Sequence, residues 1–595
     1  MKEGLPIWDA SLNRSYLADL FFALGGADSP GMAFINGLVG HLGRYGCRLY
    51  CGLPGRRKDG ASQYFPAMTK PQGNYNVDGC MHDDLQVNGQ PENRHPIPDL
   101  YTMNLRKLQG ARNMKDYQAL RLNTGIVKPT IFSGLPKLRM FKVPTCFCSD
   151  LMHLITFNLG ELNNTLWRGT LYADKTDPKS TWDWAVLSNP TTWKEHGQMV
   201  RDATPYLPGS FDRPPRNPAE KITSGYKAWE YLLYIYGIAP AVIRGVLPQE
   251  HYQNFCSLVY AIRILQQRRI TAEQLQDAHQ HLTQYVEDFE RLYYQRRADR
   301  LHMVRQSVHL LTHLAPETVR VGPLALTSQW TMETVIGNLG SEIRQPSHPF
   351  ENLCERATIR TEVNALKAMI PGLEPDMNIF PRGSVDLRDG YVLLAAHDKW
   401  FRDIPAAHQR AIKMYLASQG DYWDICLPIQ VKKWARLRLP NSQIARSAWK
   451  ECQKPLESVR MSRNVKLVSH NDHLRLAEVL YYFQMRVNGK PDTFATVVLY
   501  STPDPIILNE SRKTVWACRK GEDAEIIVIQ AKTISAVVAM PPLPLSPAEK
   551  AEINSHMKYK DRYYLIEKPG LDVAWLAGIL EGGELSGSST LEEDT

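Results

Sequence analysis

The stretch from residue 25 to residue 51 constrains the fold of this chain most, because it joins an apolar run to a carboxylate and a pair of cysteines. Residues 20–24 form a short apolar run, typical of a buried strand, and two glycines lead from it to Asp28. A strand that ends at an acid often presents a metal ligand or a general base, because the acid lies where ordered backbone meets water. Asp before Ser-Pro-Gly is also good turn chemistry, and on this stretch alone the turn is the simpler interpretation.

Length and composition indicate a globular protein of several domains. Its 595 residues, 43% of them apolar, suffice for sizeable buried cores. No uninterrupted apolar run approaches the ~20 residues that span a bilayer, and the first residues lack the charged-then-apolar layout of a secretory signal. We therefore expect a protein of the cytosol or nucleus without a membrane partner.

Charge is distributed unevenly along the chain. The net charge is +8, and residues 581–595 contain five acids and no basic residue, which leaves +13 on the remainder. A basic body is compatible with a polyanionic partner such as nucleic acid, although here the charge is spread over a large surface.

The cysteines indicate reduced thiols and a metal site. Ten cysteines without a dense, regular spacing do not resemble a disulfide framework. Residues 54–144 are poor in periodic segments, and a closed, structural Zn2+ site of Cys and His ligands would hold such an insertion in shape. The alternative is a set of buried thiols beside an exposed histidine. The predicted ligands are Cys47, Cys51, Cys80 and His82, and the competing ones are Cys146 and Cys148.

Periodicity predicts helices in the middle of the chain and strands towards its end. Residues 150–167 carry apolar side chains at helical spacing, and Thr271 with Gln274 gives a capping box at the start of a second amphipathic helix. After residue 474, apolar runs and an Asn488-Gly turn predict a small antiparallel barrel.

The predicted fold class is therefore mixed: an α/β part, an all-α part and a small all-β part. The predicted segments are a partial α/β core with the Cys/His insertion (1–170), a helical insertion domain (171–325), a helix returning to the core (326–375), a basic linker (376–470), a small β-barrel (471–545) and a tail with an acidic end (546–595).

Five short motifs, in this order and spacing, resemble the transposases of CACTA-type DNA transposons from fungi and plants. The resemblance covers most of residues 1–375. The motifs are Gly26-Ala-Asp-Ser-Pro-Gly with Gly46-Cys-Arg-Leu-Tyr-Cys, Ser149-Asp-Leu-Met-His, Leu166-Trp-Arg-Gly-Thr, Tyr206-Leu-Pro-Gly-Ser-Phe-Asp-Arg-Pro-Pro, and Gln329-Trp-Thr-Met-Glu.

The resemblance implies a ribonuclease-H-like core in which three acids hold two Mg2+ or Mn2+ ions for DNA strand cleavage and transfer. The middle acid of the family falls on Asp28 and the last on Glu333, with Asp150 and Glu161 as rivals for the last. Asp150-Leu-Met-His153 is the nearest match to a further Asp/Cys and His pair of the superfamily. Asp150 and His153 are therefore candidate catalytic residues.

One part of the family pattern is missing at the front. The first acid of the family belongs to a strand well upstream of Asp28, and Asp9 lies only nineteen residues before Asp28, too close for the strand meander of such a core. We therefore expect a truncated or domesticated transposase with a catalytically incomplete site.

Arginines supply candidate DNA contacts, because guanidinium groups bind phosphate bidentately and release counterions. For the arginines between residues 296 and 300, ion pairs with Asp299 or Glu290 on a solvated helix face are an equally good interpretation. The candidates are Arg213, Arg216, Arg296, Arg297 and Arg300.

These observations lead to one main hypothesis and two alternatives. The main one is a nuclear, DNA-binding transposase remnant that binds transposon ends and can form a homo-oligomer. The second is a domesticated, non-enzymatic DNA- or protein-binding factor with a chromatin role. The third is a scaffold whose basic excess has no specific target.

Overall fold

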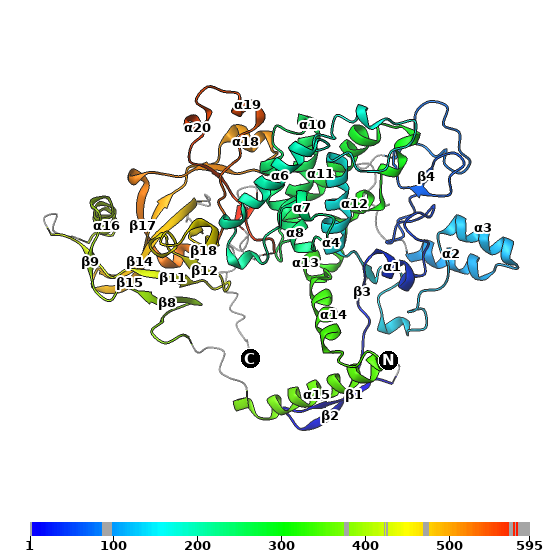
Figure 1. The fold of residues 1–595 in the computed structure, drawn as a ribbon. Helices are drawn as coiled ribbons and strands as arrows, with labels where there is room; N and C mark the ends of the chain where they lie inside the picture. The colour runs from blue at the N-terminus through cyan, green and yellow to red at the C-terminus, as the bar shows by residue number, and fades with distance from the viewer. Residues whose placement is uncertain are drawn as a thin grey trace. The chain divides into compact units, whose positions relative to one another are not determined.

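The computed structural model describes residues 3–85, 98–373, 380–421, 423, 427–467, 475–570, 575–576 and 579–580. The chain, traced from blue to red in Figure 1, divides into two compact units. The first comprises residues 1–158 and 293–379, and the second comprises residues 159–292 and 380–595. The predicted acidic end, residues 581–595, lies outside the described residues.

Helices and strands occur in both units, so the mixed class predicted from the sequence is confirmed. Within the described part of the chain, no helix combines the length and apolar character that crossing a membrane requires.

The first unit is built around two very short parallel strands. The apolar run at 20–24 forms only an isolated bridge, from Phe22 to Met140, and the strand itself is β3 (Gly25–Gly26). It pairs in parallel with β6 (Phe147–Cys148), in the register Gly25↔Phe147 and Gly26↔Cys148. The other strands of this unit are β1 (Leu5–Asp9), β2 (Arg14–Ala18), β4 (Arg56–Arg57) and β5 (Tyr64–Phe65).

Helices of the first unit come from both of its segments. The helix α12 (Gln306–Val321) is buried along most of its length, whereas α14 (Trp330–Glu342) and α15 (Pro349–Met369) contain no buried residue. The remaining α-helices are α1 (Ser29–Asn36), α2 (Pro98–Gln109), α3 (Met114–Thr124), α4 (Leu151–His153) and α13 (Leu324–Thr327).

The helical part of the second unit confirms the sequence pattern. The Thr271 hydroxyl accepts the N–H of Gln274 (3.2 Å), and the Gln274 side chain accepts the N–H of Thr271 (2.9 Å), so the predicted capping box starts α11 (Ala272–Phe289). Its apolar stripe is buried and packs beside α10 (Gln249–Leu265). The other helices before residue 300 are α5 (Gly160–Trp167), α6 (Pro190–Asp202), α7 (Pro218–Lys221), α8 (Ala228–Leu233) and α9 (Ala239–Val242).

The second unit also contains a curled antiparallel sheet, a half-barrel (yellow to orange in Figure 1). Its longest strands, β14 (Arg475–Val487) and β15 (Lys490–Leu499), are joined by the predicted Asn488-Gly489 turn, in which φ is 51° and 75°. Both left-handed φ values match a two-residue hairpin turn. The sheet also contains β7 (Val385–Arg388), β8 (Tyr391–His397), β11 (Trp434–Arg438), β12 (Ile444–Arg446), β13 (Asn464–Leu467), β17 (Ile526–Gln530) and β18 (Ile534–Val537).

Two segments hold more structure than the sequence suggested. The segment expected to be a basic linker supplies β7, β8 and β11–β13, because its arginines alternate with buried apolar residues, as in Trp434-Ala-Arg-Leu-Arg. The segment expected to be a tail forms short helices and a strand that pairs with β16. The remaining elements are β9 (Arg402–Asp403), β10 (Gln430–Val431), β16 (Ala517–Arg519), β19 (Arg562–Tyr564), β20 (Trp575–Leu576), β21 (Ile579–Leu580), α16 (Ala406–Ser418), α17 (Ala448–Glu451), α18 (Pro505–Glu510), α19 (Pro547–Lys550) and α20 (Ser555–Lys558).

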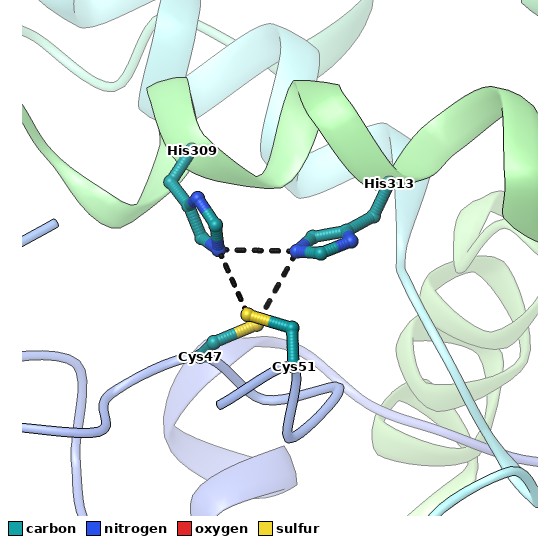
Figure 2. Close-up of side chains that lie close together, drawn as sticks. All are labelled: Cys47, Cys51, His309 and His313. Atoms are coloured by element: carbon teal, nitrogen blue, oxygen red, sulfur yellow. Dashed lines mark hydrogen bonds between the residues drawn. The ribbon is translucent and has the colours of Figure 1, made fainter. Parts of the chain in front are cut away.

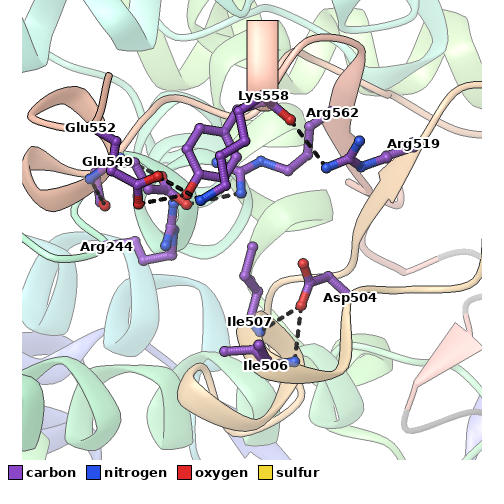
Figure 3. A network of polar contacts seen from close by, with 11 residues as sticks. Arg244, Asp504, Ile506, Ile507, Arg519, Glu549, Glu552, Lys558 and Arg562 are labelled. Carbon is purple, nitrogen blue, oxygen red and sulfur yellow. Dashed lines mark hydrogen bonds and ion pairs between the residues drawn. The ribbon is translucent and has the colours of Figure 1, made fainter. Parts of the chain in front are cut away.

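A buried charge network anchors the expected tail within the second unit (Figure 3). Glu549 accepts from Arg562 Nη1 at 2.9 Å and from Arg244, so one carboxylate serves two guanidinium groups. Burial raises the pKa of Glu549, but the hydrogen bonds and charges of these partners outweigh it and lower the pKa to about 2. Two buried cations therefore depend on a single anion.

Candidate metal centre and carboxylate pocket

Cys47 and Cys51 lie on a tight turn between α1 and β4. The N–H of Tyr50 donates to the carbonyl of Cys47 at 3.1 Å, and Tyr50 has a left-handed φ of 56°. A non-glycine residue rarely adopts this conformation, so the turn needs support from its surroundings. The Tyr50 hydroxyl supplies it, because it donates to the carbonyl of Thr124 at 2.7 Å and accepts from Asn104 at 2.9 Å.

Two histidines of α12 face this pair of cysteines (Figure 2). His309 and His313 are four residues apart on one helix and so project from the same face. Cys51 Sγ lies 3.4 Å from His309 Nε2, and Cys47 Sγ lies 3.6 Å from His313 Nε2. The two Nε2 atoms are 3.0 Å apart, and all four side chains are buried.

The separations between these side chains fit a tetrahedral metal site. With Zn–S near ~2.3 Å and Zn–N near ~2.05 Å, tetrahedral angles require S···N separations of about 3.6 Å and N···N of about 3.3 Å. The separations around Cys47, Cys51, His309 and His313 are close to these values. Among the described residues, this is the one group of three or more His, Cys, Asp or Glu side chains whose ligand atoms all lie within 4.8 Å of one another. The cluster could therefore bind a metal such as zinc.

The two thiols differ in how readily they lose a proton, and the more acidic one, Cys47, is suited to ligate a metal. The hydrogen bond from Cys51 lowers the pKa of Cys47 well below its usual value, and the nearby His313 adds to this effect against the cost of burial. The pKa of Cys51 is raised correspondingly by the same contact and by burial. One thiolate is thus already favoured, and metal ligation requires the deprotonated form.

The expected ligands Cys80 and His82 do not join this cluster. Cys80 is buried among apolar residues with its Sγ 3.9 Å from the carbonyl of Gly55. Instead of a metal, the buried guanidinium of Arg56 holds this loop. It donates to the backbone carbonyls of Ala67, Met68, Cys80, His82 and Asp83.

The other two cysteines proposed as competing ligands are also outside the cluster. Cys146 and Cys148 are buried beside and within β6, and burial raises the pKa of both thiols to about 11. They are neutral apolar side chains at physiological pH.

Two of the candidate acids follow the paired strands β3 and β6. Asp28 comes two residues after β3, and Asp150 comes two residues after β6. Because parallel strands end at the same edge of a sheet, both carboxylates lie at one edge, in a small pocket that Arg48 and His153 also line. The prediction that this strand delivers an acid at its end therefore agrees with the structure.

The two acids differ in how their oxygens are used. Asp28 is the N-cap of α1 and accepts the N–H of Gly31 at 2.8 Å, as its turn-like sequence suggested. Asp150 accepts the N–H groups of Met152 (3.1 Å), His153 (3.2 Å) and Gln329 (3.0 Å), together with a short contact to His153 Nδ1. The hydrogen-bonding capacity of Asp150 is thus largely committed within the protein.

Glu333 reaches the same place from α14. Its Oε1 lies 3.9 Å from His153 Nε2, and its side chain is half exposed. The hydrogen bond to Asp150 raises the pKa of His153 against the effect of burial, and the charges of Asp150, Glu333 and Asp28 raise it further. The acids around His153 therefore favour its protonated, positively charged form. The rival Glu161 lies on α5, in the second unit.

Family models, curated proteins and solved structures give no match to this chain. Function is therefore inferred from the side chains themselves.

Most of the candidate DNA-binding arginines already have anionic or backbone partners. Arg216 forms a two-pronged pair with buried Glu230 (2.7 and 2.8 Å). Arg297 pairs with Asp299 at 2.7 Å, as the alternative interpretation expected, Arg296 pairs with Asp84, and Arg300 is buried. Of the five arginines, only Arg213 is exposed.

Sequence reasoning missed the two histidines of the cluster. The pattern His-x3-His on an amphipathic helix was visible at 309–313 and is a known way to place two imidazoles on one face. Its partners lie 258 and 266 residues away, so no local spacing connects them.

Proposed function

We propose that this chain derives from a DNA strand-transfer enzyme of the CACTA transposase type, and that the first unit keeps the acid arrangement of a ribonuclease-H-like core. One observation carries the proposal. Asp28 and Asp150 each come two residues after one of two neighbouring parallel strands, and α14 brings Glu333 to the His153 that contacts Asp150. Acids from three distant parts of the sequence thus lie around His153.

The donor set suits a hard divalent cation only in part. Glu333 is half exposed and Asp28 uses one oxygen as a helix cap, so each carboxylate keeps an oxygen of the kind that Mg2+ or Mn2+ prefers. Such an ion, when bound, activates an attacking oxygen and stabilises a leaving one at a phosphodiester. Asp150 fits a different role, because its oxygens already accept N–H groups at the starts of α4 and α14. It orients His153 and fixes the segment that carries Glu333.

The Cys/His cluster fits a structural Zn2+ ion. All four ligands come from the protein and are buried, which leaves no open position for a substrate. The cysteines follow Asp28 in the chain and the histidines precede Glu333, so the ion would join the two segments that carry these acids.

A non-enzymatic DNA- or protein-binding factor of the same origin is the second candidate. One observation on the described residues favours its lack of catalysis: the three acids do not form a close metal-ligand set. The internal ion pairs of Arg216, Arg296 and Arg297 favour a protein over DNA as its partner. Both candidates place the protein in the nucleus, and the first candidate and the DNA-binding form of the second share DNA as partner. They differ in whether a divalent ion binds and supports cleavage.

The test combines metal binding with strand cleavage. Mn2+ binding would be measured by electron paramagnetic resonance, and nicking would be measured on transposon-end DNA, for the wild type, Asp28→Ala, Glu333→Ala and the exposed acidic control Asp99→Ala. We expect weak Mn2+ binding and weak nicking in the wild type and the control, and neither in the two site variants. Nicking that persists in Asp28→Ala would contradict the acid assignment.

The second candidate predicts a different result. The wild type would neither bind Mn2+ nor nick DNA, yet it would bind DNA with an affinity that falls steeply with salt. An affinity no tighter than that of an unrelated protein of equal charge would contradict the first candidate and the DNA-binding form of the second.

A further inference from the structure

The helix α15 presents an apolar stripe that the first unit does not bury. Ile359, Val363 and Leu366 on the helix, and Ile370 directly after it, are 50%, 43%, 50% and 50% exposed. No residue of this 21-residue helix is buried. Helical stability in proteins comes mostly from packing an apolar face against another element. The apolar stripe of α15 therefore needs a partner surface to stabilise the helix.

The spacing of the stripe is that of a coiled coil. Ile359, Val363, Leu366 and Ile370 are separated by four, three and four residues, which is the alternation of d and a positions in a heptad. Ile359 and Leu366 then occupy d positions, and Val363 and Ile370 occupy a positions. β-Branched residues at a with leucine at d, the combination at Val363, Leu366 and Ile370, favour two parallel strands, and Ile359 at the other d position adds nothing to this preference.

The residues that flank the stripe are charged in a complementary way. In this register Glu355 and Glu362 are at g positions, and Arg360 and Lys367 are at e positions. In a parallel, in-register pair each g residue faces the e residue five positions later in the other chain, so Glu355 would face Arg360 and Glu362 would face Lys367. Both pairs are attractive and each occurs twice.

An antiparallel pair would have the opposite effect. It would place g beside g and e beside e, so glutamates would face glutamates and cations would face cations. The charge pattern thus selects a parallel partner with the same sequence.

We propose that α15 is a parallel, two-stranded coiled-coil interface between two copies of this chain. The seam runs from Ile359 to Ile370, and the polar Asn352 and Arg356 at the preceding d and a positions mark its start. Arg360 also contacts Glu342 in its own chain, and its guanidinium has enough donors to keep that contact beside a partner's glutamate. With only two heptads, the dimer should form at micromolar rather than nanomolar concentration.

Charge exchange tests the proposal on the full chain by sedimentation equilibrium. One variant combines Glu355→Lys with Glu362→Lys, and the other combines Arg360→Glu with Lys367→Glu. Each variant alone should dimerise about tenfold more weakly than the wild type, because every facing pair becomes repulsive. Mixing the two should restore dimers, because every pair is attractive again. The control, Thr361→Lys with Ala368→Lys on the outer face, should dimerise like the wild type.

Three results would overturn the proposal: a wild type that stays monomeric at about 100 µM, variants that dimerise as well as the wild type, or a mixture that fails to recover. Melting temperature and zinc content verify folding. Zinc content should stay unchanged in every variant, and the melting temperature should fall slightly only where Arg360→Glu removes the contact with Glu342. Wild-type dimers insensitive to both charge variants would place the interface on another surface.

A cysteine scan tests the orientation independently. Leu366→Cys, at a d position, should form a covalent dimer under mild oxidation, because the two d residues face each other in a parallel pair. Asn364→Cys, on the outer face, should add no crosslink beyond that of the wild type with its exposed Cys354. Equal crosslinking of both variants would refute the parallel register.

Discussion

Replacing one histidine of the metal cluster should empty it. In His313→Ala three ligands remain, Cys47 Sγ loses the imidazole that lies 3.6 Å away, and a closed tetrahedral site can no longer form. We expect about one zinc per chain in the wild type and close to none in the variant after dialysis against a mild chelator. Cys51→Ser should behave in the same way, because it removes the partner of His309.

The size of the effect on stability follows from linkage. A metal that binds only the folded unit stabilises it by about 4 kcal/mol when its free concentration exceeds the Kd a thousandfold. In a unit of this size, each 1 kcal/mol moves the melting temperature by ~2–4 °C. Loss of the metal should therefore lower the melting transition of the first unit by roughly 8–16 °C.

The assay combines zinc analysis of purified protein with calorimetry. Cys80→Ser is the matched control, since Cys80 is also a buried thiol of the first unit but lies outside the cluster. It should keep its zinc and most of its melting temperature. Full zinc retention in both His313→Ala and Cys51→Ser, or zinc loss in Cys80→Ser, would refute the ligand assignment.

Three further predictions concern buried charges. Arg56→Lys should cost about 3 kcal/mol in urea unfolding, because an ammonium cannot reach the carbonyls that the guanidinium bonds, whereas Arg57→Lys should cost little. Glu549→Gln should cost roughly 3 kcal/mol at neutral pH, because it leaves two buried cations without their anion. Since the pKa of Glu549 is lowered from 4.5 to about 2, its contribution is complete above 4.5, and the difference from the variant should shrink as the pH falls towards 2. Asp150→Asn should lower the pKa of His153 in an NMR titration, and an unchanged pKa would contradict the contact.

Local patterns in the sequence predicted local structure well. The Thr271 capping box and the Asn488-Gly489 hairpin are both present, because each depends on residues at most three positions apart. Asp28 agrees with both of its interpretations, as a turn residue and as an acid near a strand end, since it caps α1 two residues after β3.

Patterns that mix charge with apolar residues were harder to interpret. The basic segment around Trp434 was expected to be a linker, yet its arginines alternate with buried side chains and form a strand of the half-barrel. Apolar residues do alternate with charged ones there, but the many arginines made the segment look solvent-exposed. Whether such a segment forms a strand depends on its neighbours in the sheet, which the sequence does not show.

The sequence by itself determined which residues are able to ligate a metal and that Cys47 and Cys51 act as a pair, because cysteine chemistry and close spacing are properties of the chain. Only the tertiary structure decided that His309 and His313, and not Cys80 and His82, complete the cluster. The nearer pair was the better choice by sequence distance, but the packing of α12 against the cysteine turn brings together side chains more than 250 residues apart. The guanidinium of Arg56 holds the loop that contains Cys80 and His82 by donating to backbone carbonyls of that loop, so the loop is held in place without a metal.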